Sequence, residues 1–85
     1  MSGTIIRFSD HARFEMRRRG IRKPEVIRTI LQPGQVLSSI KGRKIYQSLI
    51  GPSNVLLLRV VVKEVPGAYD VITVYKTSKI AKYWR

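Results

Sequence analysis

Five residues of this 85-residue chain could together cleave RNA without a metal ion. Such a reaction needs a group that accepts the proton of the 2′-hydroxyl, a donor for the leaving oxygen and cations that stabilise the charged phosphorus centre. His11 or Lys44 could accept the proton, and Tyr83 or His11 could donate it. Arg59 and Lys76 could stabilise the negative charge. These residues form the candidate catalytic set.

His11 is the only histidine of the chain and lies in the first turn of a predicted helix. The positive end of the helix dipole disfavours an imidazolium ion, so the ring is expected to stay neutral and able to accept a proton. Glu15 follows four residues later on the same side of the helix and could orient the ring. For an isolated histidine, a hydrogen bond across an element junction is the more common explanation.

A second group of residues combines positive charge with aromatic rings. Lysine and arginine neutralise phosphates, and aromatic faces stack on unpaired bases. This stacking stabilises binding by about 1–3 kcal/mol per base. Packing within a sheet is an equal alternative for Tyr46 and Tyr75. The predicted nucleic-acid-binding residues are Arg17, Arg19, Arg43, Lys44, Tyr46, Tyr75, Lys79 and Lys82.

The charge balance points to a polyanionic partner. Seventeen Lys and Arg residues against five acidic residues give a net charge of +12, which opposes compactness unless phosphates or an acidic protein offset it. A generally solvated basic surface is the alternative. RNA is favoured over DNA because RNA carries its own nucleophile, the 2′-hydroxyl.

Several classes of protein are disfavoured by what the sequence lacks. No cysteine is present, which excludes disulfides, thiolate zinc sites and a cysteine nucleophile. The five acidic residues are scattered without the spacing of a metal site, and no glycine-rich phosphate loop occurs. We therefore expect neither a metal nor a cofactor. No apolar stretch resembles a signal or a membrane span, so we expect one cytoplasmic domain over residues 1–85.

Two helices are predicted in the first part of the chain. Ser9 is a suitable N-cap for a helix that runs to about Arg19, and Gly20 can adopt the left-handed conformation that ends it. Pro24 suits the first turn of a second helix, which the Pro33-Gly34 pair ends.

Four strands are predicted after these helices. Residues 36–40 and 44–50 form a hairpin around Lys41-Gly42-Arg43, and runs at 55–64 and 70–75 follow. The run at 55–64 alternates between apolar residues and a side that carries charge, which is typical of a central strand. These patterns predict an α+β fold in which two N-terminal helices pack on a curved four-stranded antiparallel sheet. The sequence also predicts a short C-terminal helix capped by Ser78.

The chain resembles a domain-of-unknown-function family within the RelE/ParE toxin superfamily. The resemblance covers about residues 8–84 and is carried by the string H-A-x-x-x-M-x-x-R-G-I, from His11 to Ile21, and by the later T-V-Y ending at Tyr75. Positions that match the closer family are His11, Arg19, Thr73 and Tyr75. That family often has a basic residue where this chain has Glu15, which puts in doubt a role for that position in binding phosphate.

The resemblance implies a toxin of a toxin–antitoxin pair that cleaves messenger RNA, often on the ribosome, and an acidic antitoxin that covers its basic face. Arg59, Lys76 and Tyr83 are counterparts, by resemblance only, of the basic and tyrosine residues of better-known members. A non-catalytic RNA- or ribosome-binding module is the main alternative. A toxin-like inhibitor that acts on a protein is another, because some members of the superfamily act on gyrase and cleave nothing.

Overall fold

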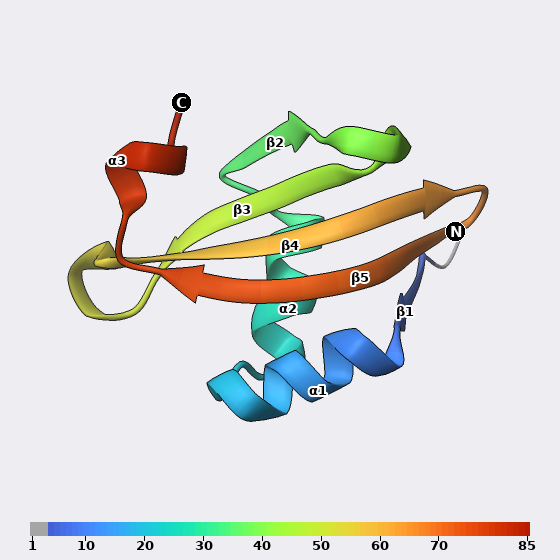
Figure 1. Cartoon of the computed structure of the whole chain (residues 1–85), viewed down its shortest axis with the longest axis horizontal. Helices are drawn as coiled ribbons and strands as arrows, with labels where there is room; N and C mark the ends of the chain where they lie inside the picture. The colour runs from blue at the N-terminus through green and yellow to red at the C-terminus, as the bar shows by residue number, and fades with distance from the viewer. Residues whose placement is uncertain (1–3) are drawn as a thin grey trace.

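Five strands and three helices make up residues 4–85, the part of the chain that the computed structural model describes. The strands are β1 (Ile5–Phe8), β2 (Gln35–Ser38), β3 (Lys44–Ile50), β4 (Leu56–Val65) and β5 (Ala68–Thr77). The helices are α1 (Asp10–Arg19), α2 (Lys23–Leu31) and α3 (Ile80–Tyr83). Figure 1 shows the strands as one curved sheet with α1 and α2 beneath and behind it.

The strands form one sheet in the order β1-β5-β4-β3-β2. Pairs β2–β3, β3–β4 and β4–β5 are antiparallel, whereas β1 pairs in parallel with the first half of β5. The chain leaves β1 at one edge of the sheet and enters β2 at the other. Because α1 and α2 make this crossing, they cover one face of the sheet.

The predicted four-stranded antiparallel sheet is wrong, because the sheet has five strands and is mixed. The missed strand, β1, has only four residues, and its partners in β5 lie 63 positions along the chain, as in the pair Arg7 and Asp70. A short apolar run next to a helix start gives no local sign of so distant a parallel partner. The prediction of two N-terminal helices on the sheet holds.

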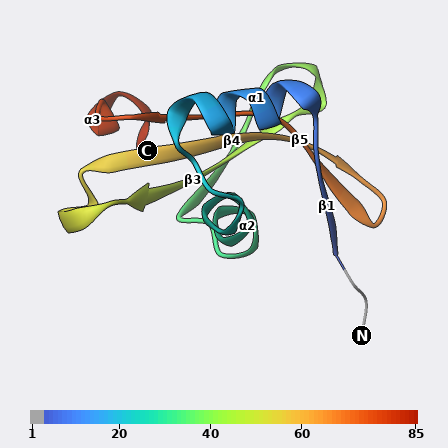
Figure 2. The ribbon, with the colours of Figure 1, turned by 90° about the horizontal axis from the view of Figure 1, so that it is seen from below.

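The main core lies between the sheet and the two helices. Ala12 and Met16 of α1 and Val26 and Ile30 of α2 pack against apolar strand residues. The strand residues of this cluster are Tyr46, Leu58, Val60, Val62, Val71 and Val74. α1 and α2 thus contribute to one core, and Figure 2 shows α2 below the strands, away from α3 at the end of β5. The other face of the sheet therefore lacks the cover of α1 and α2.

The two ends of α1 form as the sequence predicts. The Ser9 hydroxyl accepts a hydrogen bond from the Ala12 amide, and Gly20 ends the helix with φ 67°. The same hydroxyl donates to the carbonyl of Ile72 at 2.9 Å, beside the irregularity where the β4–β5 register shifts. Ser9 therefore ties the start of α1 to a strand carbonyl at an interrupted part of the ladder.

The predicted C-terminal helix is present, but its predicted cap is not. The N-cap position of α3 is Lys79, and no side chain there caps the helix. Ser78 lies outside the helix, and its exposed hydroxyl has no hydrogen bond within residues 4–85. None of the described helices is long and apolar enough to cross a membrane.

Replacing Ser9 with Ala should lower the free energy of unfolding by about 1–3 kcal/mol, because it removes an N-cap and leaves a strand carbonyl without its donor. Ser78→Ala is the matched control and should change it by less than about 0.5 kcal/mol. Urea denaturation followed by circular dichroism measures both. Equal losses for the two variants would contradict the double role of Ser9.

Candidate nucleic-acid interface

A row of four polar side chains crosses the face of the sheet that α1 and α2 leave uncovered. Gln35 is the register partner of Gln47, Gln47 of Arg59, and Arg59 of Tyr75. These residues come from β2, β3, β4 and β5, and we call them the polar row. Their face, the open face, also carries Leu57 and Val61, which alternate with the core residues of β4.

Hydrogen bonds join all four members of the polar row, and the donations run outward from Arg59 on both sides. Gln47 Nε2 donates to Gln35 Oε1 at 2.8 Å, and Arg59 Nε donates to Gln47 Oε1 at 2.9 Å. Arg59 Nη1 donates to the Tyr75 hydroxyl at 2.6 Å. Gln47 is fully buried and Arg59 is 6% exposed, so the bonds form away from water and hold the guanidinium in a fixed plane.

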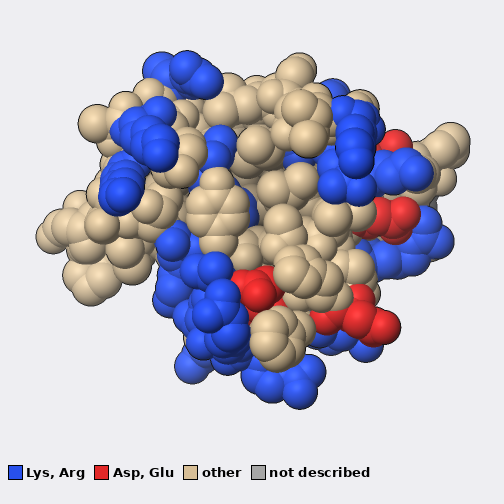
Figure 3. Space-filling view, viewed as in Figure 1, with Lys and Arg blue, Asp and Glu red and all other residues tan. Residues whose placement is uncertain are grey.

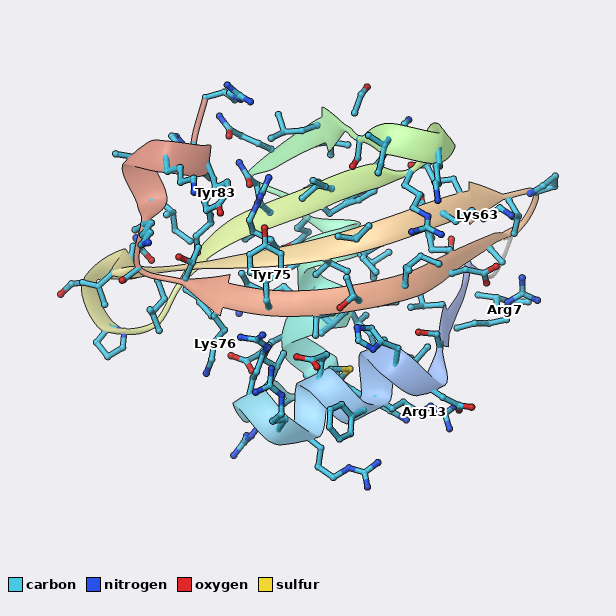
Figure 4. All side chains as sticks on the ribbon, viewed as in Figure 1. Arg7, Arg13, Lys63, Tyr75, Lys76 and Tyr83 are labelled. Atoms are coloured by element: carbon cyan, nitrogen blue, oxygen red, sulfur yellow. The ribbon has the colours of Figure 1, made fainter. Side chains whose placement is uncertain are left out.

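Two aromatic rings lie against the guanidinium group. Its carbon atom is 4.1 Å from the centroid of the Tyr83 ring and 5.7 Å from that of Tyr75. The two rings meet edge to face, with centroids 6.4 Å apart. Figure 4 shows Tyr75 rising from β5 and Tyr83 reaching in from α3. The rings stabilise the cation through their electron-rich faces.

Arg59 is a buried cation whose partners are all neutral. No carboxylate lies within 4.0 Å of it among the described residues, whose four ion pairs involve other cations. The second terminal nitrogen of Arg59, Nη2, makes no hydrogen bond within residues 4–85. Every fully buried side-chain nitrogen or oxygen of these residues has a partner, so Nη2 is not fully buried and reaches solvent. The Tyr75 oxygen accepts from Arg59, which leaves its own proton free to be donated. The site therefore has two free donors and an uncompensated positive charge.

The C-terminal segment that carries Tyr83 is docked by a few polar contacts. Gln35 Nε2 donates to the Arg85 carbonyl at 2.7 Å, and the Arg85 amide donates back to Gln35 Oε1 at 3.1 Å. Gln47 Nε2 donates to the Tyr83 carbonyl at 3.2 Å. The Trp84 ring lies so close to Gly34 that a Cβ there would be 2.9 Å from Trp84 Cη2.

Basic side chains surround the open face. In Figure 3, blue atoms gather at both ends of the visible face and below it, around a central tan strip with few red atoms. Lys82 adds its ammonium group 5.3 Å from the centroid of the Tyr83 ring. The strip therefore combines exposed ring surface with cations on either side.

The structure brings together two members of the candidate catalytic set, Arg59 and Tyr83, and separates the other three. His11 is exposed on α1, and Lys44 pairs in register with the core residue Val62. Lys76 pairs with Leu58, so it also points to the helix side of the sheet. Neither proposed proton acceptor shares the open face with Arg59.

The expected partner of His11 is engaged elsewhere. Glu15 accepts from Arg19 Nε at 2.7 Å and from Arg18 Nη2 at 3.0 Å. These two hydrogen bonds lower the pKa of its carboxyl below the ordinary value. Glu15 therefore holds the arginines of the last turn of α1 in place. Arg19, a predicted phosphate ligand, is one of them, while its neighbour Arg17 is exposed.

The other predicted nucleic-acid-binding residues divide between the two faces. Tyr75 lies in the polar row, and Lys79 and Lys82 lie at α3 beside it. Arg43 follows the short 3-10 turn at Ile40–Gly42, in the hairpin that the sequence predicts. Lys44 lies at the start of β3 and forms a 3.5 Å ion pair with Glu64.

Tyr46 belongs to the core. It is 7% exposed, its hydroxyl donates to Glu64, and its ring meets Tyr69 edge to face. Burial, and then the Glu64 hydrogen bond, raise the pKa of its hydroxyl. The packing alternative applies to Tyr46, whose ring has no face free for a base.

Sequence reasoning missed Gln35, Gln47 and the seat of Trp84 on Gly34. A glutamine in the mostly apolar run of β3 was the one available sign of a buried polar contact. Its partner could be found only from the strand register. Within residues 4–85, no group of three or more histidine, cysteine, aspartate or glutamate side chains could hold a metal ion.

Replacing Gly34 with Ala should release the C-terminal segment, because the new methyl group would meet Trp84 at 2.9 Å and the Gln47 carbonyl at 3.2 Å. Trp84 is the only tryptophan, so its fluorescence emission should shift to longer wavelength as the ring enters water. Gln35→Ala should give the same shift by removing the Arg85 bonds. Gln32→Ala, at an exposed position after α2, is the control and should leave the emission unchanged. A wild-type spectrum for Gly34→Ala would refute the docking.

Comparison with known proteins gives one match. The model of a domain-of-unknown-function family, DUF4258, matches residues 8–76, a range that includes Gln47, Arg59 and Tyr75 but not Tyr83. No curated protein and no solved structure matches significantly. The link to the RelE/ParE toxin superfamily stays a prediction from the resemblance. Since the match spans most of the chain, the protein belongs to the DUF4258 family.

Proposed function

We propose that the protein binds single-stranded RNA on the open face, with a phosphate at Arg59 and bases stacked on Tyr75 and Tyr83. The observation that carries this proposal is the buried guanidinium with neutral partners only. A buried charge is costly unless an opposite charge or strong hydrogen bonds offset it, so an anion that reaches Nη2 gains a strong charge-assisted contact.

The donors at this site suit a phosphate oxygen. The hydrogen bond from Arg59 Nη1 to the Tyr75 oxygen, 2.6 Å long, holds the two groups together. Each group keeps one free donor, the hydroxyl proton of Tyr75 and the solvent-facing Nη2 of Arg59. Two donors held side by side can bind one anion at two points, which a single mobile lysine cannot do. The neutral acceptor Gln47 fixes the guanidinium without neutralising its charge.

The rings favour unpaired nucleotides over other polyanions. A duplex hides the faces of its bases, whereas a single strand can stack them on tyrosine and arginine planes. The net charge of +12 supplies the long-range attraction for a polyanion. Messenger RNA in the cytoplasm, also on the ribosome, is the RNA that the family resemblance suggests.

Arg59→Gln should weaken binding of a labelled oligouridylate tenfold or more, about 1.4 kcal/mol, because it removes the fixed guanidinium. Arg28→Gln is the matched control: it removes one charge from an exposed position on α2, across the sheet from Arg59. It should weaken binding less than about twofold. Fluorescence anisotropy measures both, with circular dichroism to confirm folding. Equal losses would mean that net charge alone drives binding, and no binding by the wild type would refute the proposal.

RNA cleavage is a second candidate, favoured by the hydroxyl of Tyr83. It makes no hydrogen bond within residues 4–85, and its ring lies against the cation proposed to hold the phosphate. This hydroxyl could donate a proton to the leaving oxygen, as a toxin-type endoribonuclease requires. Neither His11 nor Lys44 shares its face, so the 2′-hydroxyl proton would pass to water.

Tyr83→Phe distinguishes cleavage from binding, because it keeps the ring and removes the donor. If the protein is a ribonuclease, induced wild type should generate new messenger RNA ends in primer extension, and Tyr83→Phe should lose at least tenfold of this activity. Its affinity for oligouridylate should change less than about twofold. His11→Ala, on α1, should cleave like the wild type. If the wild type binds RNA but generates no new ends, cleavage is excluded and the protein is a non-catalytic binding module.

A further inference from the structure

We propose that the bound RNA continues from the polar row over the edge of β5 to a second contact surface at the end of α1. This surface consists of Phe14, Arg18, Arg19 and Lys76, and we call it the α1 surface. The inference rests on the proposed function and extends it from one phosphate site to a path for several nucleotides.

The edge of β5 connects the two surfaces. β1 pairs with β5 only from Ala68 to Val71, so the second half of β5 has no strand on that side. Tyr75 projects onto the open face there, and the next residue, Lys76, projects to the side of α1. In Figure 4, Lys76 points down from β5 toward the C-terminal end of α1. Adjacent residues of one strand therefore face the two surfaces.

The α1 surface has more positive charge than its single carboxylate can balance. Arg18 and Arg19 share Glu15, and their side chains remain 54% and 36% exposed. Lys76 forms no ion pair within the described chain. Figure 3 shows a dense group of blue atoms beside a small red group, below the central strip on the same visible face.

An exposed aromatic ring makes RNA a better fit than an acidic protein. Phe14 is 58% exposed and lies four residues before Arg18, so the two side chains are neighbours on one side of the helix. A ring beside a guanidinium repeats the combination found at Arg59, and it suits a base followed by a phosphate. An acidic peptide would use the cations but not the ring face.

The length dependence of binding tests this path, with oligouridylates of about six and about fifteen nucleotides. Wild type should bind the longer one at least tenfold more tightly. Arg18→Gln/Lys76→Gln should abolish most of this advantage and leave affinity for the shorter one within twofold. Glu15 keeps Arg19 as a partner in this variant. Each phosphate contact with a single strand contributes about 0.7 to the slope of log affinity against log salt. Loss of two contacts should therefore make this slope shallower by about 1.4 for the longer strand.

Two further variants separate position from charge. Lys23→Gln/Arg28→Gln removes the same charge from exposed positions on α2, outside both surfaces, and should keep the length advantage. Phe14→Ala changes no charge and should weaken binding of the longer strand threefold or more. A length advantage that survives both Arg18→Gln/Lys76→Gln and Phe14→Ala would refute the path while leaving the proposed function intact.

Loss of the proposed function itself would look different. If wild type binds neither oligouridylate, both proposals fall. A polyglutamate peptide, used as a probe in the same assay, identifies the alternative: binding of this peptide without RNA binding, lost in Arg18→Gln/Lys76→Gln, would mean that the α1 surface docks an acidic protein.

Discussion

The burial of one positive charge organises the open face. Arg59 is 6% exposed, and its guanidinium therefore needs acceptors inside the protein. Gln47 and Tyr75 accept from Nε and Nη1 across the neighbouring strands, and Nη2 is left to face solvent. A carboxylate at either position would form a stronger pair but would cancel the charge. Neutral acceptors and ring faces instead stabilise the cation and leave its field directed outward.

This arrangement depends on a sheet with two different faces. β4 supplies Leu58, Val60 and Val62 to the core under the helices, so the intervening residues must point to the opposite face. Arg59 reaches the middle of that face because β4 is the central strand. A one-residue slip in the register of β4 would put the charge into the core, so the apolar packing against α1 and α2 also fixes the position of the cation.

Local patterns predicted the elements, and distant pairings escaped them. The caps of α1, Pro24 in α2, the hairpin around Lys41-Gly42-Arg43 and the alternation of β4 all come from neighbouring residues. The parallel partner of β1 and the polar row depend on strand order and register, which one sequence does not show. For the same reason the candidate catalytic set combined residues of both faces: side chains that suit one reaction by type are separated by the thickness of a sheet.

The Arg59 site is built from parts of unequal stability. Gln47 and Arg59 come from paired strands with core residues on their other side, whereas Tyr83 comes from a four-residue helix that is held by Trp84 on Gly34 and by bonds to two glutamines. Segments with few buried contacts open at low cost. Gln35 and Gln47 join the two parts, because they bind the C-terminal segment with the same amides that extend the polar row. A ligand that moves Tyr83 therefore acts on a segment that can yield, while the cation beneath it stays in place.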